Sequence, residues 1–117
     1  MKNHTSTVRA CARAAALTSA LVLTVLPQAW ASDAKAGKRL AVQCAMCHGP
    51  VGLSVLPSAP HIAGQPAFYL EEQLRLYRSG KRTNEIMSVI AKPLTDAEIE
   101  NLSAWYASIR IEVVSPE

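Results

Sequence analysis

Residues 44–48 read Cys-Ala-Met-Cys-His, and this stretch decides the fold. Two cysteines separated by two residues and followed at once by a histidine form the pattern that covalent haem attachment requires. Each thiol can add to one vinyl group on the haem edge, and His48 then falls beneath the iron as its proximal ligand. The stretch therefore predicts one covalently bound haem c, held by Cys44, Cys47 and His48.

Three other interpretations of the same residues stay open. A thioredoxin-like redox pair also uses Cys-x-x-Cys, but it needs a βαβ context, and no strand pattern surrounds this motif. A zinc site needs four ligands, and beyond residue 31 the cysteines and histidines are Cys44, Cys47, His48 and His61. A disulfide across so short a loop would leave the histidine unexplained. Haem attachment accounts for all residues of the motif together.

The first 31 residues have the features of a secretory signal peptide. These features are a basic start (Lys2, Arg9, Arg13), an apolar run (residues 14–26) and the small-x-small cleavage site Ala-Trp-Ala (residues 29–31). The apolar run is too short to span a bilayer comfortably, so we expect cleavage rather than anchoring. We therefore expect a periplasmic protein without stable membrane insertion, whose mature domain covers residues 32–117.

Loss of the leader changes the charge of the chain. The whole sequence has 12 Lys and Arg against 9 Asp and Glu, and three of the basic residues but none of the acidic ones lie in the leader. The mature chain is then near neutral, which gives no case for nucleic-acid binding. A domain of this size is marginal with a polypeptide core alone, so we expect its order to depend on the haem.

The segment around the motif is predicted to be a helix followed by a loop. Asp33 suits the N-cap of a first helix that runs to about Cys44 and delivers the motif. From Gly49 to Gly64 the chain is rich in proline and glycine, which favours an extended loop. Such a loop can wrap the haem.

Two further helices are predicted after the loop. Pro66 suits the first turn of a helix that runs to Ser79 and is ended by Gly80. Thr95 and Glu98 form a Thr-x-x-Glu capping box before a last helix. The apolar stripe of that helix comprises Ile99, Leu102, Trp105, Tyr106 and Ile109. The predicted fold class is all-α.

Four segments beyond the haem motif carry a family pattern. They are residues 60–65 (Pro-His-Ile-Ala-Gly-Gln), 69–74 (Tyr-Leu-x-x-Gln-Leu), 77–82 (Tyr-x-x-Gly-x-Arg) and 94–107, from Leu-Thr-Asp-x-Glu-Ile to Trp-Tyr-Ala. With the motif, they resemble the small monohaem class I cytochromes c of bacteria, and one half of the dihaem members. The resemblance implies the cytochrome c fold, in which three main helices, a short helix and loops wrap one covalent haem. The single haem motif excludes haem-to-haem transfer within the chain.

The sixth ligand of the iron is predicted partly by elimination. Met1 leaves with the leader, and Met46 lies inside the attachment loop on the proximal side, so Met87 is the methionine that remains. Two alternatives stay open: Met87 as ordinary core filler, and His61 as a rival ligand in a bis-histidine site of lower potential.

The resemblance adds residue roles that the pattern alone does not give. It implies His48 and Met87 as the axial pair, and the Pro60 carbonyl as the acceptor for the other ring N–H of His48. It also implies that Gly37 lets the first helix approach the last one near Leu102 and Trp105.

A basic cluster ends the second predicted helix. It comprises Arg75, Arg78, Lys81 and Arg82, where cations complement the helix dipole. A solvated face is the ordinary interpretation. The alternatives are that Arg82 reaches a haem propionate or that the cluster meets an acidic partner.

Two strong-field axial ligands leave the iron no position for a substrate, so the predicted function is electron transfer and not catalysis. Transient redox protein partners would dock on a haem edge flanked by apolar residues, among them Val55, Leu56, Pro57, Ile62 and Val89. This apolar surface would also allow a homodimer. The alternatives are a haem c subunit of a larger periplasmic dehydrogenase or oxidase assembly, and a haem peroxidase-type enzyme with an open distal site.

Overall fold

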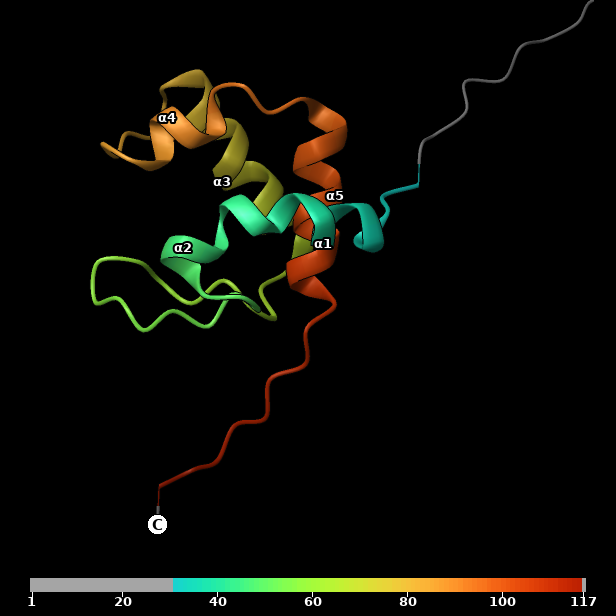
Figure 1. The fold of residues 1–117 in the computed structure, drawn as a ribbon, viewed down its shortest axis with the longest axis vertical. Coiled ribbons are helices and arrows are strands. Elements are labelled where there is room, and N and C mark those ends of the chain that lie inside the picture. Colours follow the sequence, from blue (N-terminus) through green and yellow to red (C-terminus); the bar gives the residue numbers. More distant parts are fainter. Residues whose placement is uncertain (1–30, 117) are drawn as a thin grey trace, which may run out of the picture.

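A computed structural model of the chain describes residues 31–116 (Figure 1). The predicted leader, apart from Ala31, lies outside the described residues. The described residues form helices and no strands, and their elements are α1 (Ala34–Leu40), the 3₁₀ turn η1 (Ala41–Gln43), α2 (Ala45–His48), α3 (Ala67–Ser79), α4 (Met87–Ala91) and α5 (Asp96–Ala107). The all-α fold class is confirmed. None of the described helices is long and apolar enough to cross a membrane.

The first predicted helix is broken where it meets the haem motif. Asp33 caps α1 as expected, because its side chain accepts the Lys35 N–H at 2.8 Å. The helix does not continue to Cys44, however, since the Cys44 N–H donates to the Ala41 carbonyl at 3.0 Å in a 3₁₀ turn. Helix α2 then begins at Ala45 and holds four of the five residues of the motif.

Gly49 ends α2 with a backbone conformation that favours glycine. Its φ is +78°, and a Cβ atom there would lie 2.2 Å from the Leu53 carbonyl oxygen. The chain can therefore leave the motif only through a glycine at this point. From there to α3 it runs as a loop with no regular element, as the breakers predicted.

Helices α1 and α5 cross at Gly37, which is buried. A Cβ atom on Gly37 would lie 1.9 Å from the Asn101 carbonyl oxygen and 2.9 Å from the Trp105 Cβ. Beside the crossing, the Lys38 ammonium lies 5.3 Å from the centre of the Trp105 ring. The close approach implied for Gly37 is present, but its partners are Asn101 and Trp105, whereas Leu102 is part of the core.

The ends of α3 and α5 follow the sequence signals. Pro66 precedes α3 as its cap residue, one position earlier than the first turn, and Gly80 ends the helix with a left-handed φ of +75°. Thr95 and Glu98 form both hydrogen bonds of the capping box at the start of α5.

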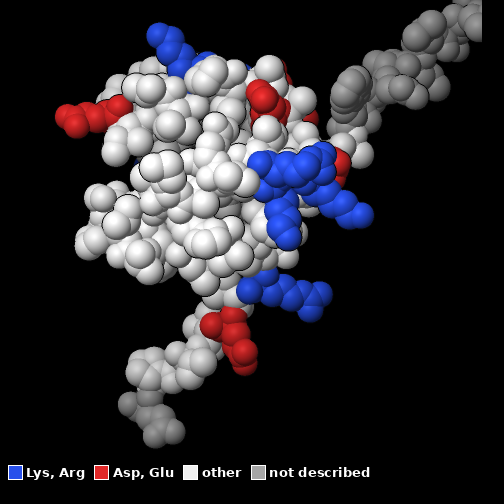
Figure 2. Space-filling view, viewed as in Figure 1, with Lys and Arg blue, Asp and Glu red and all other residues white. Residues whose placement is uncertain are grey.

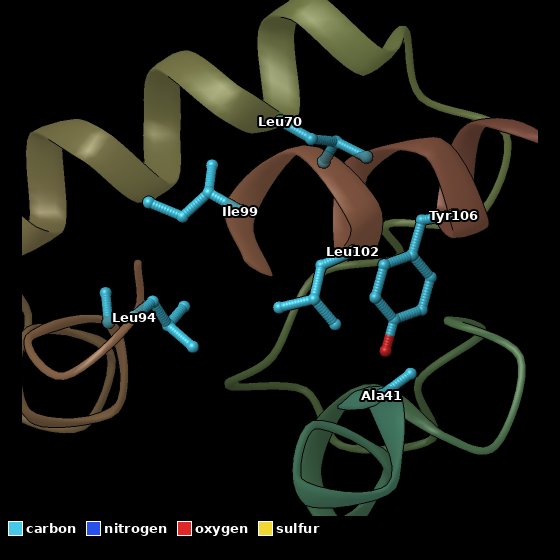
Figure 3. Packing of buried hydrophobic residues seen from close by; sticks show 7 residues of the cluster. Ala41, Leu70, Leu94, Ile99, Leu102 and Tyr106 are labelled. Atoms are coloured by element: carbon cyan, nitrogen blue, oxygen red, sulfur yellow. The ribbon is translucent and has the colours of Figure 1, made fainter. Parts of the chain in front are cut away.

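Helix α5 lies at the centre of the fold, with α1 and α3 packed against it and α4 packed against α3. The buried apolar cluster comprises Ala41, Leu70, Ala91, Leu94, Ile99, Leu102 and Tyr106, and Figure 3 shows it between α3, α5 and the turn that carries Ala41. This core is small, and only Ile99 and Leu102 are large apolar side chains less than 2% exposed among the described residues. A core of this size gives only marginal stability by itself, so a bound cofactor would add to the stability of the fold.

Candidate haem site

His48 is the last residue of α2 and is only 7% exposed. Its Nδ1 atom lies 2.9 Å from the Pro60 carbonyl oxygen. Because a carbonyl oxygen only accepts hydrogen bonds, Nδ1 must carry the proton and donate it. In the neutral imidazole with this tautomer, the other ring nitrogen, Nε2, has its lone pair available for a metal ion.

The two cysteines of the motif are free, half-buried thiols. Cys44 is the cap residue of α2, and its carbonyl accepts the His48 N–H at 2.9 Å, so the two residues stand one helical turn apart. Burial raises the pKa of the Cys44 thiol, and the Tyr106 hydroxyl beside it lowers that pKa in part. Because both thiols are free, the structure contains no disulfide between Cys44 and Cys47, and the disulfide interpretation is wrong for this structure.

Ser54 fastens the loop to the haem motif. Its hydroxyl donates to the Cys47 carbonyl at 2.7 Å, and its backbone N–H donates to His61 Nδ1 at 2.9 Å. The loop closes further where the Gly52 carbonyl accepts the Ile62 N–H at 2.8 Å. Ser54 could not be predicted from the sequence, because a serine in a loop rich in proline and glycine carries no signal of its own.

His61 takes part in this loop network rather than in a metal cluster. Its Nδ1 accepts the Ser54 N–H, and its side chain is exposed. No group of three or more His, Cys, Asp or Glu residues within 31–116 is placed to hold a metal ion. The zinc interpretation has no support here, and neither has the thioredoxin-like one, since residues 31–116 contain no strand.

Met87 is the first residue of α4 and is half-buried. Asn84 holds its backbone, because Asn84 Oδ1 accepts the N–H of Met87 at 2.9 Å and that of Ile86 at 3.0 Å. Asn84 is, after Ser54, a second residue that holds the backbone of the candidate site and was not predicted from the sequence. An asparagine two to three residues before a helix is the available signal.

His48 and Met87 belong to separate arms of the molecule. Helix α2 is joined to α1 through η1, whereas α4 packs on α3, and both arms meet at α5. Figure 1 shows α2 and α4 on the same side of the molecule, away from the crossing of α1 and α5. The fold therefore supplies an imidazole and a thioether from two independent segments.

Two residues of the basic cluster, Arg75 and Arg78, are paired with acidic side chains. Arg75 forms ion pairs with Glu71 at 3.0 Å and Glu100 at 3.1 Å, and Arg78 pairs with Asp96 at 2.6 Å. The hydrogen bond and charge of Arg78 lower the pKa of Asp96. The pairs with Glu100 and Asp96 tie α3 to α5, whereas the pair with Glu71 lies within α3. Lys81 and Arg82 of the cluster remain exposed.

Arg82 lies three residues beyond the end of α3 and contacts two side chains of that helix. Its guanidinium lies 4.6 Å from the centre of the Tyr77 ring and donates to the side-chain oxygen of Gln73. These two contacts hold the Arg82 side chain against the end of α3.

A surface without charged side chains lies over α2 and the loop that follows it. Figure 2 shows this face in white, with lysine, arginine, aspartate and glutamate at its margins. Apolar side chains are exposed in these segments, with Met46 87% and Val55 93% accessible. Exposed apolar side chains on an uncharged face are typical of an interaction surface.

The donor set fits haem c. Two free thiols stand three residues apart, the buried imidazole has its Nε2 lone pair available, and a half-buried thioether comes from the opposite arm. The model of the family described as Cytochrome c matches residues 34–110. The chain belongs to the cytochrome c family. Covalently bound haem c is its cofactor, and electron transfer is its activity.

Known relatives agree with this assignment. This chain is 37% identical over 81 residues to cytochrome c-554(548) of Halomonas halodenitrificans. The alignment covers 67% of this chain and 98% of that protein. It is 39% identical over 70 residues to a thiosulfate dehydrogenase electron acceptor of Stutzerimonas stutzeri, covering 57% of this chain and 32% of that protein.

The solved structure of reduced cytochrome c4 from Pseudomonas stutzeri has the same fold. It matches with a TM-score of 0.65 and 32% identity, covering 68% of this chain and 47% of that one. This chain thus spans nearly all of cytochrome c-554(548) but about half of the cytochrome c4 chain. The cytochrome c fold that the resemblance implied is confirmed.

Proposed function

We propose that this cytochrome c is a periplasmic one-electron carrier in which His48 and Met87 are the two axial ligands of a haem attached through Cys44 and Cys47. The observation that carries the proposal is the hydrogen bond from His48 Nδ1 to the Pro60 carbonyl, which leaves Nε2 for the iron. When bound, haem c supplies an iron that takes up and releases one electron. The periplasmic location rests on residues 1–31, proposed to be a cleaved signal peptide.

The proposed role of His48 depends on its partner. The Pro60 carbonyl holds the Nδ1 proton at 2.9 Å, which fixes the ring orientation. It also makes Nε2 a stronger electron donor, since a hydrogen-bonded imidazole is more basic at its other nitrogen. Pro60 is in this proposal a supporting residue for the proximal ligand.

The proposed role of Met87 is to complete the coordination from the other arm. Its backbone is held by Asn84 and its helix packs on α3, so the side chain starts from a fixed position. A thioether ligand favours the reduced state and raises the potential. With both axial positions filled, no site is left for a substrate, and we propose a carrier rather than an enzyme.

Partners are proposed to dock transiently on the uncharged face over α2 and the following loop. One relative is named as an electron acceptor of thiosulfate dehydrogenase, which supports a redox enzyme as the donor. Small, weakly charged interfaces suit electron transfer because the complex must dissociate quickly. If the protein isolated from its source elutes as a large complex, the alternative of a permanent haem c subunit is favoured.

The variant Met87→Ala tests the axial pair. We expect loss of the absorption band that reports methionine bound to ferric iron, a lower potential, and new binding of imidazole or cyanide. Met46→Ala is the matched control, because Met46 is 87% exposed and lies within the attachment motif. Identical spectra and potentials in both variants would contradict the assignment of Met87.

A further inference from the structure

Tyr106 contacts the haem-binding segment at three places. Its ring packs on Gly52, where a Cβ atom would lie 2.8 Å from Tyr106 Cδ1. Its carbonyl accepts the Gly64 N–H at 2.8 Å, which closes the far end of the loop on α5. Figure 3 shows its hydroxyl pointing toward the turn that carries Ala41, directly before Cys44. Tyr106 therefore meets the segments on both sides of the motif.

The hydroxyl of Tyr106 is a buried donor that is not used. The residue is 4% exposed, and its oxygen has no hydrogen-bond partner among the described residues. Buried hydroxyl groups normally find a partner, so an unused one requires an explanation. Burial raises the pKa of Tyr106, and Cys44 beside it raises that pKa further, so the hydroxyl keeps its proton throughout the physiological range.

Cys44 is the group that lies beside this hydroxyl. Cys44 is half-buried and packs against the same apolar cluster to which Tyr106 belongs. A free thiol can both donate and accept, whereas a sulfur bonded to two carbons has only lone pairs and accepts. Attachment of haem at Cys44, which is part of the function proposed above, would therefore make the sulfur an acceptor facing a protonated hydroxyl.

We propose that the Tyr106 hydroxyl donates a hydrogen bond to the Cys44 sulfur in the haem-loaded protein, and that Tyr106 is a positioning residue that raises the reduction potential. The bond draws electron density from the sulfur and so from the porphyrin edge to which it is joined. Lower electron density disfavours the ferric state more than the ferrous state. The same bond satisfies the buried hydroxyl and fixes Cys44 relative to α5.

The variant Tyr106→Phe in the haem-loaded protein tests the inference. It keeps the ring that packs on Gly52 and the carbonyl that binds Gly64, and it removes only the hydroxyl. We expect a lower midpoint potential with the same amount of attached haem. Tyr69→Phe is the matched control, since Tyr69 is 41% exposed on α3, and its potential should equal that of the wild type. Equal potentials in Tyr106→Phe and the wild type would overturn the inference.

A second measurement needs no variant. In the reduced, diamagnetic wild-type protein, the Tyr106 hydroxyl proton should exchange slowly and show a nuclear Overhauser effect to the Cys44 β-protons. A hydroxyl proton without this contact would overturn the inference even if Tyr106→Phe failed to fold. Covalent haem in the wild-type protein is established separately by its pyridine haemochrome spectrum. A failure of the proposed haem attachment is thus distinguishable from a failure of the role of Tyr106.

Discussion

Ser54 connects the loop to the haem motif through two hydrogen bonds. Its hydroxyl holds the Cys47 carbonyl and its backbone N–H holds His61, so the loop that contains Pro60 is kept next to His48. The proximal histidine is therefore oriented by a network, in which Pro60 makes the direct contact. Residues that support a ligand in this way affect both stability and the electronic properties of the site.

The variant Ser54→Ala should destabilise the haem-loaded protein by about 0.5–1.5 kcal/mol, because the half-buried Cys47 carbonyl loses its donor. The free energy of unfolding in guanidinium chloride measures the effect. Ser58→Ala is the control, since Ser58 is exposed in the same loop. Equal unfolding free energies for the two variants would show that the Ser54 hydroxyl does not hold the loop.

Sequence reasoning named the cysteines and His48 because covalent attachment requires those residue types at that spacing. It did not name Ser54 or Asn84, whose roles depend on backbone groups brought near by the folded loop. Pro60 was found only through the family resemblance. Local chemistry was thus predictable, whereas hydrogen bonds that cross a loop were not.

At the scale of the helices, the crossing of α1 and α5 depends on one missing side chain. Gly37 lets the two backbones approach so closely that a methyl group has no room beside Asn101. The same crossing carries the N-terminal arm, and with it α2 and the motif. Helix packing there therefore sets the position of the haem-binding cysteines relative to the core.

The variant Gly37→Ala should destabilise the protein by about 1–3 kcal/mol, because the added Cβ forces the helices apart. Helix propensity alone would predict the opposite, a small gain in stability, because alanine favours a helix more than glycine does. Thermal unfolding followed by circular dichroism distinguishes the two. Lys35→Ala serves as control on the exposed side of α1, and a Gly37→Ala variant as stable as this control would contradict the close crossing.

Acid should weaken the start of α5. Hydrogen bonds from Thr95 lower the pKa of Glu98, and Arg78 lowers that of Asp96, from ordinary values of 4.5 and 3.8. Because the folded-state pKa values are lowered, the stabilisation is present above the ordinary values and is lost as pH falls through the folded ones. The melting temperature of an Asp96→Asn, Glu98→Gln variant should depend less on acid pH. Glu112→Gln, in the exposed tail, should keep the wild-type dependence.

The ends of helices were more predictable than their continuity. The capping box and Gly80 mark boundaries through local chemistry, and both boundaries are present. The 3₁₀ turn at Ala41 was not predicted, since residues 34–44 carry no breaker after Gly37 and the switch depends on packing. The pairing of Arg75 and Arg78 with α5 was also missed, because charge spacing gives no information about partners on another helix.

For the whole molecule, the main feature is the small number of buried side chains among residues 31–116. The apolar cluster lies around α5, while apolar side chains such as Val55 and Val89 remain exposed. A chain with so small a core gains stability from a cofactor that binds the native state. Folding and haem attachment should therefore be coupled.

The double variant Cys44→Ala, Cys47→Ala tests this coupling. Without covalent attachment, we expect weak helical circular dichroism and no cooperative thermal transition. Ser58→Ala, matured in the same way, should keep the native spectrum. A double variant with native-like helix content and cooperative melting would show that the polypeptide core is sufficient.

The most direct measurement is the mass and visible spectrum of the purified mature protein after expression with a competent haem-attachment system. We expect a red protein whose mass exceeds that of the polypeptide by one haem, with the excess retained after denaturation because the bonds to Cys44 and Cys47 are covalent. A colourless protein with the mass of the polypeptide alone would contradict it.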